Sequence, residues 1–177
     1  MTLTTQPKPY GLHHVVVASI DGLTSAPLPA STKFSFLERV TSAEGPGDDA
    51  IATVVSVLEA IDWALEATGL SLDAYAIIAG VSTTQHGTTP NQAKTLNRHG
   101  AVRFPYFQIY GEALGEGNDD VHCIIYKAKV TTGIQADMEY KKLQNTVIKG
   151  VGIDDGVNGV YDFVQHETAQ ALVVEGS

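Results

Sequence analysis

Histidine and cysteine are the residue types in this chain of 177 residues that most readily do chemistry, and their spacing does not build a catalytic centre. The six histidines are dispersed, at positions 13, 14, 86, 99, 122 and 166. His13 and His14 are neighbours in a β-branched run, so on a regular strand their side chains point to opposite faces and cannot readily hold one metal ion together. Cys123 is the only cysteine and lies in an apolar, strand-like stretch, which favours a small buried side chain over a nucleophile.

Paired carboxylates are the other candidates for chemistry, and they lie in turns. The pairs are Asp48-Asp49, Asp119-Asp120 and Asp154-Asp155, each beside glycine or asparagine. Loop carboxylates can bind Ca²⁺, but none of the pairs has the spacing of an EF-hand loop. Since Asp and Asn are favoured in turns, we interpret the pairs as turn residues and surface charge, and we predict no metal and no cofactor. The sequence contains no nucleophile elbow, phosphate-binding loop, dinucleotide fingerprint or zinc spacing, so it predicts a protein that is not an enzyme.

The composition restricts the class of protein further. Lys and Arg number 11 against 20 Asp and Glu, and the net charge of −9 argues against tight binding of phosphate backbones, which needs clustered cations. One cysteine and no apolar leader are typical of a protein that folds in a reducing cytosol. No apolar run approaches the roughly 18 residues that a membrane span needs. With 44% apolar residues, the chain is expected to form one domain with its own core.

Residues 53–80 are the stretch around which the rest must be arranged, because they form the longest apolar-patterned run and contain the only tryptophan, Trp63. From residue 55 to residue 67 apolar and polar side chains alternate, which is typical of a half-buried strand. A helical period also fits these residues, and Ala, Leu and Glu are good helix formers. We predict a strand that ends near Ala67.

A short helix is predicted to follow that strand at residues 72–79. Ser71 is a candidate N-cap, Asp73 favours the first turn, and Gly80 can adopt the left-handed conformation of a C-cap. The apolar face of this helix is expected to contain Leu72, Tyr75, Ala76 and Ala79.

Alternating or β-branched runs predict the remaining strands. They cover residues 13–20, 33–40, 101–113, 121–131, 134–148 and 160–166, with a marginal strand at 93–96. Residues 41–50 and the rest of 81–100 are polar enough to be predicted as loops. Pro105 lies inside the run 101–113, which indicates an edge strand or a bulge.

Together these elements predict a mainly β protein, namely a β-sandwich or small barrel of about seven strands with one short flanking α-helix and extended N- and C-terminal arms. Residues 1–11 would form the N-terminal arm, residues 12–168 a single domain and residues 169–177 the C-terminal tail. Such a fold suits a self-assembling subunit, whose edge strands pair with those of other copies. It also suits a monomeric module that holds an apolar ligand between aromatic side chains, of which the candidates are Phe34, Phe36, Trp63 and Tyr106.

Three runs of the sequence resemble the major tail tube proteins of long-tailed bacteriophages. They are WALEATGLSLDAYAIIAGVSTTQHGTTPNQAKTL, FPYFQIYGEALGEGNDDVHCIIYKAKVT and YDFVQHET. The likeness spans residues 55–168 and lies in the strand–glycine–helix of 63–80, the GTTPN and FPYF segments, and the acidic turn before Val121. The resemblance implies a β-sandwich with a flanking helix, six copies to a ring, and rings stacked into the hollow virion tube through which DNA is ejected.

The resemblance also implies partners and contact surfaces. Tail terminator and tail tip proteins would bind the tube, a tape measure protein would fill its lumen, and DNA would pass without specific binding. The inner tube of a contractile injection system, which shares the fold, is the alternative. Candidate residues for contacts between rings lie in the N-terminal arm and the 41–50 loop: Tyr10, Gly11, Glu44, Gly45, Pro46 and Gly47. Candidate helix and core residues are Trp63, Leu72, Tyr75 and Ala76.

The net charge suits a tube for DNA independently of the resemblance. A ring of six copies would carry six times −9, and an acidic lumen would repel DNA phosphates near its wall. We hypothesise that some of the following acidic residues face the lumen: Asp48, Asp49, Glu112, Glu116, Asp119, Asp120 and Asp137.

Overall fold

The computed structural model describes residues 8–46, 51–69 and 71–174. Within these residues the chain forms ten strands and one α-helix, so the predicted mainly β fold with a single short helix is confirmed. The elements are β1 (Pro9–Ser19), β2 (Ser25–Pro27), β3 (Ser31–Pro46), β4 (Ile51–Ala67), α1 (Leu72–Ala79), β5 (Thr83–His86), β6 (Ala93–Leu96), β7 (Phe107–Gly115), β8 (Asp120–Asp137), β9 (Asn145–Gly152) and β10 (Tyr161–His166).

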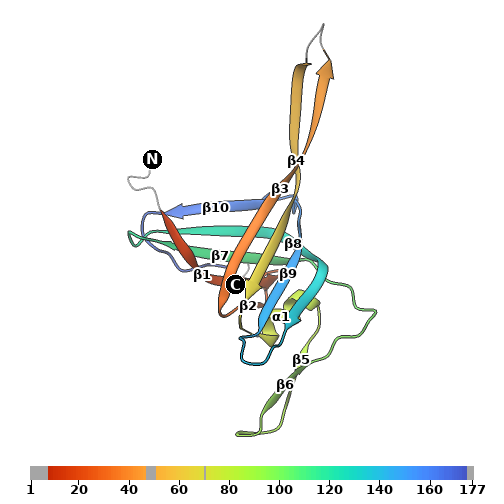
Figure 1. The fold of residues 1–177 in the computed structure, drawn as a ribbon, viewed down its shortest axis with the longest axis vertical. Coiled ribbons are helices and arrows are strands. Elements are labelled where there is room, and N and C mark those ends of the chain that lie inside the picture. Colours follow the sequence, from red (N-terminus) through yellow and green to blue (C-terminus); the bar gives the residue numbers. More distant parts are fainter. Residues whose placement is uncertain (1–7, 47–50, 70, 175–177) are drawn as a thin grey trace.

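Eight of these strands form one antiparallel sheet in the order β2-β1-β7-β8-β9-β4-β3, with β10 added alongside β8. The sheet folds over along β8. The first part of β8 pairs with β7 and β10, whereas its second part pairs with β9, with a register shift between Val130 and Ile134. As a result, β1, β7, the first part of β8 and β10 lie side by side along one axis, and β3, β4 and β9 cross them (Figure 1). The remaining two strands, β5 and β6, form a separate hairpin.

The core lies between the crossing strands and is closed at one end by α1. Ile61, Trp63 and Leu65 of β4 all point into it, so the alternation of the sequence belongs to a strand, as predicted. Trp63 packs edge-on against Phe107 with the ring centroids 5.7 Å apart. Tyr75 of α1 belongs to the same cluster. The part of the longest apolar run from Ile61 to Ala67 is therefore the strand at the centre of the core.

The helix α1 begins and ends where the sequence predicts. Ser71 accepts a hydrogen bond from the Ala74 N–H at 3.3 Å, and Gly80 has the left-handed backbone (φ 68°) of a C-cap. The predicted apolar face is only partly correct. The buried residues are Ala74, Tyr75, Ile78 and Ala79, whereas Leu72 and Ala76 are half-buried at its margin. The helix packs against the core through residues 74, 75 and 78. These lie on one side of the helix, because residue 78 follows residues 75 and 74 by three and four positions.

Four sequence predictions for strands and loops are wrong. Residues 83–86, predicted as part of a loop, form β5 and pair with β6. Residues 41–46, predicted as a loop, continue β3 and pair with β4, because backbone pairing does not require apolar side chains. The predicted strand 134–148 is interrupted. Residues 134–137 complete β8, and β9 begins only at Asn145, since the apolar side chains of the intervening turn are exposed. Pro105 lies before β7 rather than inside a strand. The marginal strand at 93–96 is confirmed as β6.

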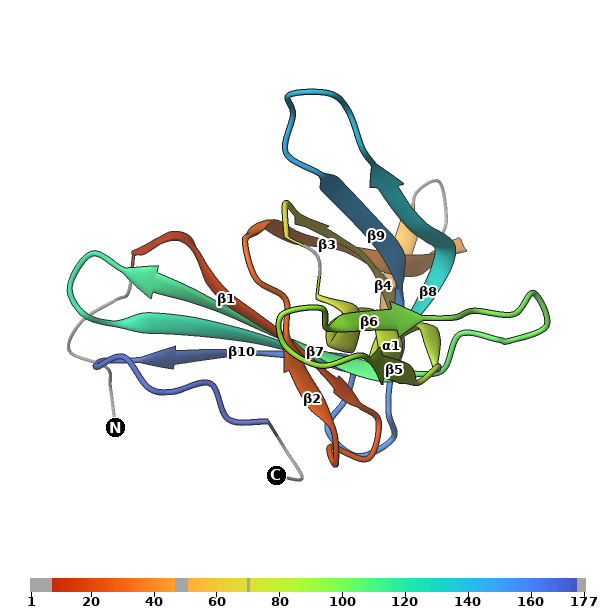
Figure 2. The ribbon, with the colours of Figure 1, turned by 90° about the horizontal axis from the view of Figure 1, so that it is seen from below.

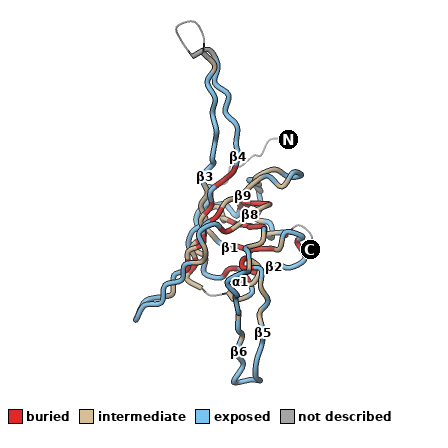
Figure 3. Tube along the Cα trace, turned by 90° about the vertical axis from the view of Figure 1, so that its right-hand side faces the viewer, coloured by how far each residue is buried: buried red, intermediate tan, exposed pale blue. Residues whose placement is uncertain are grey.

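Two hairpins project from the body in opposite directions (Figure 1). One is the outer part of β3 and β4, and the other is β5–β6. Both are exposed along most of their length (Figure 3). Seen from below, β1, β7 and β10 extend together away from α1, and the segment after β10 turns back beside them (Figure 2). The body therefore supplies the core, and the hairpins extend beyond it.

The two predicted terminal arms are shorter than the sequence indicated. Residues 9–11 already belong to β1, where Pro9 pairs with Gly115 of β7. At the other end, Ala169 donates a backbone hydrogen bond to Asn118 at 2.8 Å, and Val174 is buried against Ala18 and Tyr110. Residues 169–174 therefore pack on the body, because they cover apolar side chains of β1 and β7. Residues 1–7 and 175–177 lie outside the described residues.

Candidate assembly surface

The outer half of the β3–β4 hairpin has no other strand beside it in the described part of the chain. The strand β4 pairs with β9 only from Ile61 to Ala67, so residues 51–58 pair with residues 40–46 of β3 alone. Where this region begins, Glu59 is an extra residue of β4 between the pairs of Arg39 and Val40. Such a bulge bends the strand that carries it. We call residues 40–46 and 51–58 the arm.

Both faces of the arm carry apolar side chains. The cross-strand register places Val40, Val54 and Leu58 on one face and Ala43, Val55 and Val57 on the other. The four valines are 50–58% exposed and Leu58 is 37% exposed. Glu44 is the only charged residue in the arm. Valine favours strands, which explains why the hairpin forms, but the protomer offers it no core to enter.

An apolar hairpin of this kind needs a partner. A two-stranded hairpin alone is marginally stable in water, and a contiguous exposed apolar surface marks a site of protein contact. The outer edge of β3 is open too, since among the described strands β3 pairs with β4 only, and Leu37 on it is 71% exposed. An open edge presents unpaired N–H and C=O groups to another strand. The arm and the outer edge of β3 together form the candidate assembly surface.

The residues predicted to join rings fall in two places. Glu44, Gly45 and Pro46 belong to the arm, close to its tip. Tyr10 and Gly11 lie at the start of β1, where Tyr10 is 86% exposed. Gly47 lies outside the described residues. The contact residues predicted from the sequence include the tip of the arm but not its valines. Alternation from residue 55 onward predicts a half-buried strand there instead. The signal that could have found them is the run of apolar residues on both faces from 53 to 58.

The prediction that acidic residues face a lumen is wrong for three of them. Asp120, Asp119 and Glu112 are buried within the protomer, at 0%, 3% and 9% exposure. The carboxylates of Asp119 and Asp120 are held by polar groups of the turn and the neighbouring strands; Asp119, for example, accepts the Gly117 N–H at 3.1 Å. Glu116 and Asp137 are exposed, but they lie at opposite ends of β8 and form no common patch. Asp48 and Asp49 lie outside the described residues.

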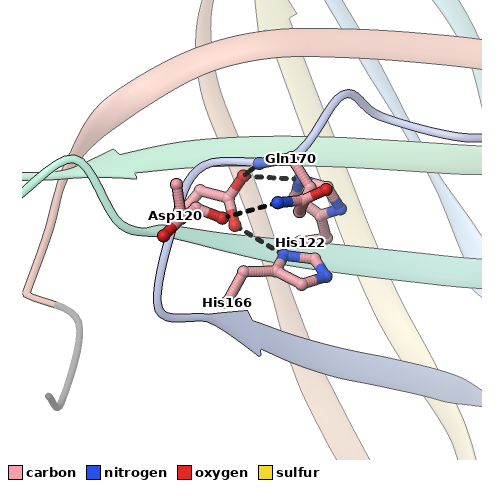
Figure 4. Close-up of polar contacts among 5 residues, drawn as sticks. Asp120, His122, His166 and Gln170 are labelled. Carbon is pink, nitrogen blue, oxygen red and sulfur yellow. Dashed lines mark hydrogen bonds and ion pairs between the residues drawn. The ribbon is translucent and has the colours of Figure 1, made fainter. Parts of the chain in front are cut away.

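Asp120 instead anchors the C-terminal segment (Figure 4). Its carboxylate accepts the Gln170 N–H at 2.6 Å and contacts His166 Nδ1 at 2.6 Å and His122 Nε2 at 3.2 Å. Burial alone would raise the pKa of Asp120, but the hydrogen bonds from Gln170 and His166 and the attraction of both imidazoles lower it below its usual value. An ionised carboxylate thus fastens residues 166–170 to the start of β8.

The prediction that His13 and His14 point to opposite faces is wrong. Leu12 pairs with Ala113 and His14 with Glu112, so His13 is the extra residue of a β-bulge in β1. In a bulge two residues oppose one, and the strict alternation of faces is lost. One ligand atom from each of His13, His14 and Glu112 lies within 4.8 Å of the others. Sequence alone gave no sign of this bulge.

The aromatic residues proposed to hold a ligand do not surround one cavity. Trp63 is buried in the core against Phe107, whereas Tyr106 lies at a surface hollow beside Ile77 and Pro105. Phe36 contacts Tyr161 and Phe163 of β10 instead. The prediction of a buried cysteine is confirmed, since burial of Cys123 raises the pKa of its thiol to about 12 and keeps it protonated at neutral pH.

Comparison with known proteins adds no further assignment. Neither a scan against protein-family models nor a search of curated proteins finds a match to this chain. The described residues include no helix with the length and apolar character needed to cross a membrane.

Proposed function

We propose that the chain is a structural subunit that assembles with copies of itself into stacked rings, which form a hollow tube of the kind found in the tails of long-tailed bacteriophages. The arm carries this proposal. It exposes apolar side chains on both faces, and the chain has no other segment on it among the described residues. The proposed partner of the arm is a second copy of the same chain, because a self-assembling subunit always has identical copies beside it.

Covering the arm would contribute to the free energy of assembly. Burying a valine that is already half-covered gains on the order of 1 kcal/mol, and six apolar side chains of the arm would contribute in each subunit. The arm projects beyond the body, because residues 51–58 lie past Ile61, where the pairing of β4 with β9 ends. A neighbouring ring is therefore within its range, while the open edge of β3 is available to a neighbour in the same ring.

The charge of the chain fits passage of DNA through such a tube. A subunit of net charge −9 would repel phosphates over most of its surface, so DNA could slide along the wall. Six copies to a ring, virion location, a tape measure protein in the lumen, and terminator and tip proteins at the ends belong to the proposal through the resemblance of the sequence. Glu116 and Asp137, which are exposed, remain candidates for the lumen wall.

The proposal is tested by placing charge on one face of the arm. Val55 and Val57 lie on the same face, and the double variant Val55→Asp/Val57→Asp should leave the body folded because neither side chain enters the core. We expect the unchanged chain to form rings or tubes when concentrated, and the double variant to remain monomeric. Negative-stain electron microscopy and sedimentation velocity measure both outcomes.

A matched control uses a valine elsewhere on the surface. Val157 is 88% exposed in the turn before β10, so Val157→Asp adds one negative charge, half of what the double variant adds, without touching the arm. This variant should assemble like the unchanged chain. Tubes formed by the double variant, or monomers of the unchanged chain that persist in the presence of preformed tube ends as initiators, would contradict the proposal.

A further inference from the structure

The carboxylate of Asp120 is fully buried, and both of its oxygens contact polar partners. A buried charge is tolerated only when it is paired or binds a metal ion. Among the described residues, the ion-pair partners of Asp120 are His122 and His166, and neither lysine nor arginine contacts it.

The strand register brings the three side chains to one face of the sheet. Asp120 and His122 are two residues apart in β8, and His166 of β10 pairs directly with Asp120. His166 Nδ1 lies 2.6 Å and His122 Nε2 lies 3.2 Å from the carboxylate, with the two rings 4.7 Å apart and edge-on (Figure 4). Two imidazole nitrogens and one carboxylate oxygen thus converge within 4.8 Å of one another.

We propose that Asp120, His122 and His166 bind a divalent transition-metal ion of the Zn²⁺ class. Two imidazoles and one carboxylate are a ligand set that zinc accepts, with a fourth position left for water. Zinc bonds of about 2.0–2.1 Å in a tetrahedral site separate the ligand atoms by roughly 3.3 Å. The 3.2 Å from His122 Nε2 to Asp120 Oδ2 already matches this separation, and His166 Nδ1, which lies 2.6 Å from the other oxygen of the same carboxylate, belongs to a partly exposed side chain that can adjust.

The surroundings support the ligands and give access to them. The Gln170 N–H donates to Asp120 Oδ2 at 2.6 Å, and such outer hydrogen bonds orient ligating carboxylates. A surface hollow of about 700 Å³, lined by residues that include His122, His166 and Gln170, opens beside the three side chains. An ion can therefore enter from solvent, and water can complete its coordination. Bound metal would fix residues 166–170 to β8.

The triad of His13, His14 and Glu112 is the competing site in the same protein. Its donors also lie within 4.8 Å of one another, but His13 and His14 are exposed and no hydrogen bond orients either ring in the described residues. Holding two free side chains in place costs conformational entropy on binding. The Asp120 site is already ordered, so we assign the metal to it.

The test measures binding of ZnCl₂ to the full chain after treatment with a chelator and dialysis. We expect one equivalent to bind in competition with a chromogenic chelator. Loss of an outer-shell partner usually lowers metal affinity 10–100-fold, so His166→Gln, which removes a ligand, should lower it by at least about 100-fold. Glutamine can still donate a hydrogen bond to Asp120, so this variant keeps the fold, which circular dichroism checks.

Two control variants and two further measurements make the result decisive. His14→Ala, in the competing triad, and His99→Ala, an exposed histidine outside both triads, should bind Zn²⁺ as the unchanged chain does. Co²⁺ in place of Zn²⁺ should give the visible absorption of a four- or five-coordinate ion, and this absorption should be absent with His166→Gln. Zn²⁺ should also slow hydrogen exchange of the Gln170 amide. Absence of binding, unchanged binding by His166→Gln, or loss of binding with His14→Ala would overturn the assignment. None of these readouts depends on whether the chain assembles.

Discussion

Trp63 has room in the core because the residue opposite it in β9 is a glycine. Trp63 pairs with Gly150, and a Cβ atom there would lie 2.0 Å from the Lys129 backbone oxygen and 2.5 Å from the indole ring. Since a backbone oxygen cannot easily move aside, Gly150→Ala should lower the free energy of unfolding by an amount near the upper end of roughly 1–3 kcal/mol. Urea unfolding followed by Trp63 fluorescence measures this change.

Gly100→Ala is the matched control for this prediction. A Cβ atom at Gly100 meets nothing within 4 Å, so its free energy of unfolding should stay within about 0.5 kcal/mol of that of the unchanged chain. Equal stability of the two variants would show that Gly150 does not limit the packing of Trp63. The sequence alone does not reveal this role of Gly150, because a glycine that makes space for a distant tryptophan looks the same as a glycine that allows a turn.

Asp155 closes the turn between β9 and β10, and its effect should depend on pH. Its Oδ1 accepts the backbone N–H groups of Val157, Asn158 and Gly159 at 2.7–3.1 Å. These hydrogen bonds, from Val157 above all, lower the pKa of Asp155 below its usual value. The stabilisation is therefore complete above the usual value of about 3.9 and is lost as pH falls through the lower pKa of the folded state.

The variant Asp155→Asn should accordingly have a lower melting temperature than the unchanged chain at pH 7, and the difference should shrink as the pH falls below about 3.9. Melting curves by circular dichroism between neutral and acid pH give the comparison. Glu116→Gln, which neutralises an exposed carboxylate in the turn before β8, controls for the change in net charge. A difference between Asp155→Asn and the unchanged chain that is constant with pH would contradict this account.

Among the helices and strands, the sequence predicted those whose signals come from residues close together in the chain. The ends of α1 follow from Ser71 and Gly80, which act on their own neighbours in the chain. The strand 55–67 follows from alternation, although only its part from Ile61 onward enters the core. Up to residue 58 the same alternation belongs to the exposed arm. Periodicity identifies a strand, but it does not say whether another layer lies against it.

Elements and sites that depend on pairing could not be predicted in this way. Residues 41–46 look like a polar loop and become a strand because β4 lies beside them. His13 and His14 share a side only because β1 contains a bulge opposite Glu112. Likewise, His166 is 46 residues away from Asp120 in the chain, and the pairing of β10 with β8 brings them together. The acidic turn was recognised in the sequence, but its partners were not.

At the scale of the whole molecule, the body and the arm have separable tasks, and deletion of the arm tests this. Joining Thr41 to Val57, which pair directly, through an Asn-Gly turn removes residues 42–56 and leaves a hairpin of favourable geometry. None of the removed side chains that the structure describes belongs to the core. The shortened chain should fold with a free energy of unfolding within about 1 kcal/mol of that of the unchanged monomer.

The same deletion should abolish assembly, because it removes Ala43, Val54 and Val55 and shortens the arm that we propose to contact a neighbouring ring. Near-ultraviolet circular dichroism of Trp63 reports whether the core is intact, and electron microscopy reports whether tubes form. A folded, monomeric product would separate the two tasks as expected. Tubes built from the shortened chain would remove the arm from the proposed function and leave the outer edge of β3 to account for assembly. Loss of the native Trp63 signal would show instead that the arm stabilises the protomer, which its exposure on both faces argues against.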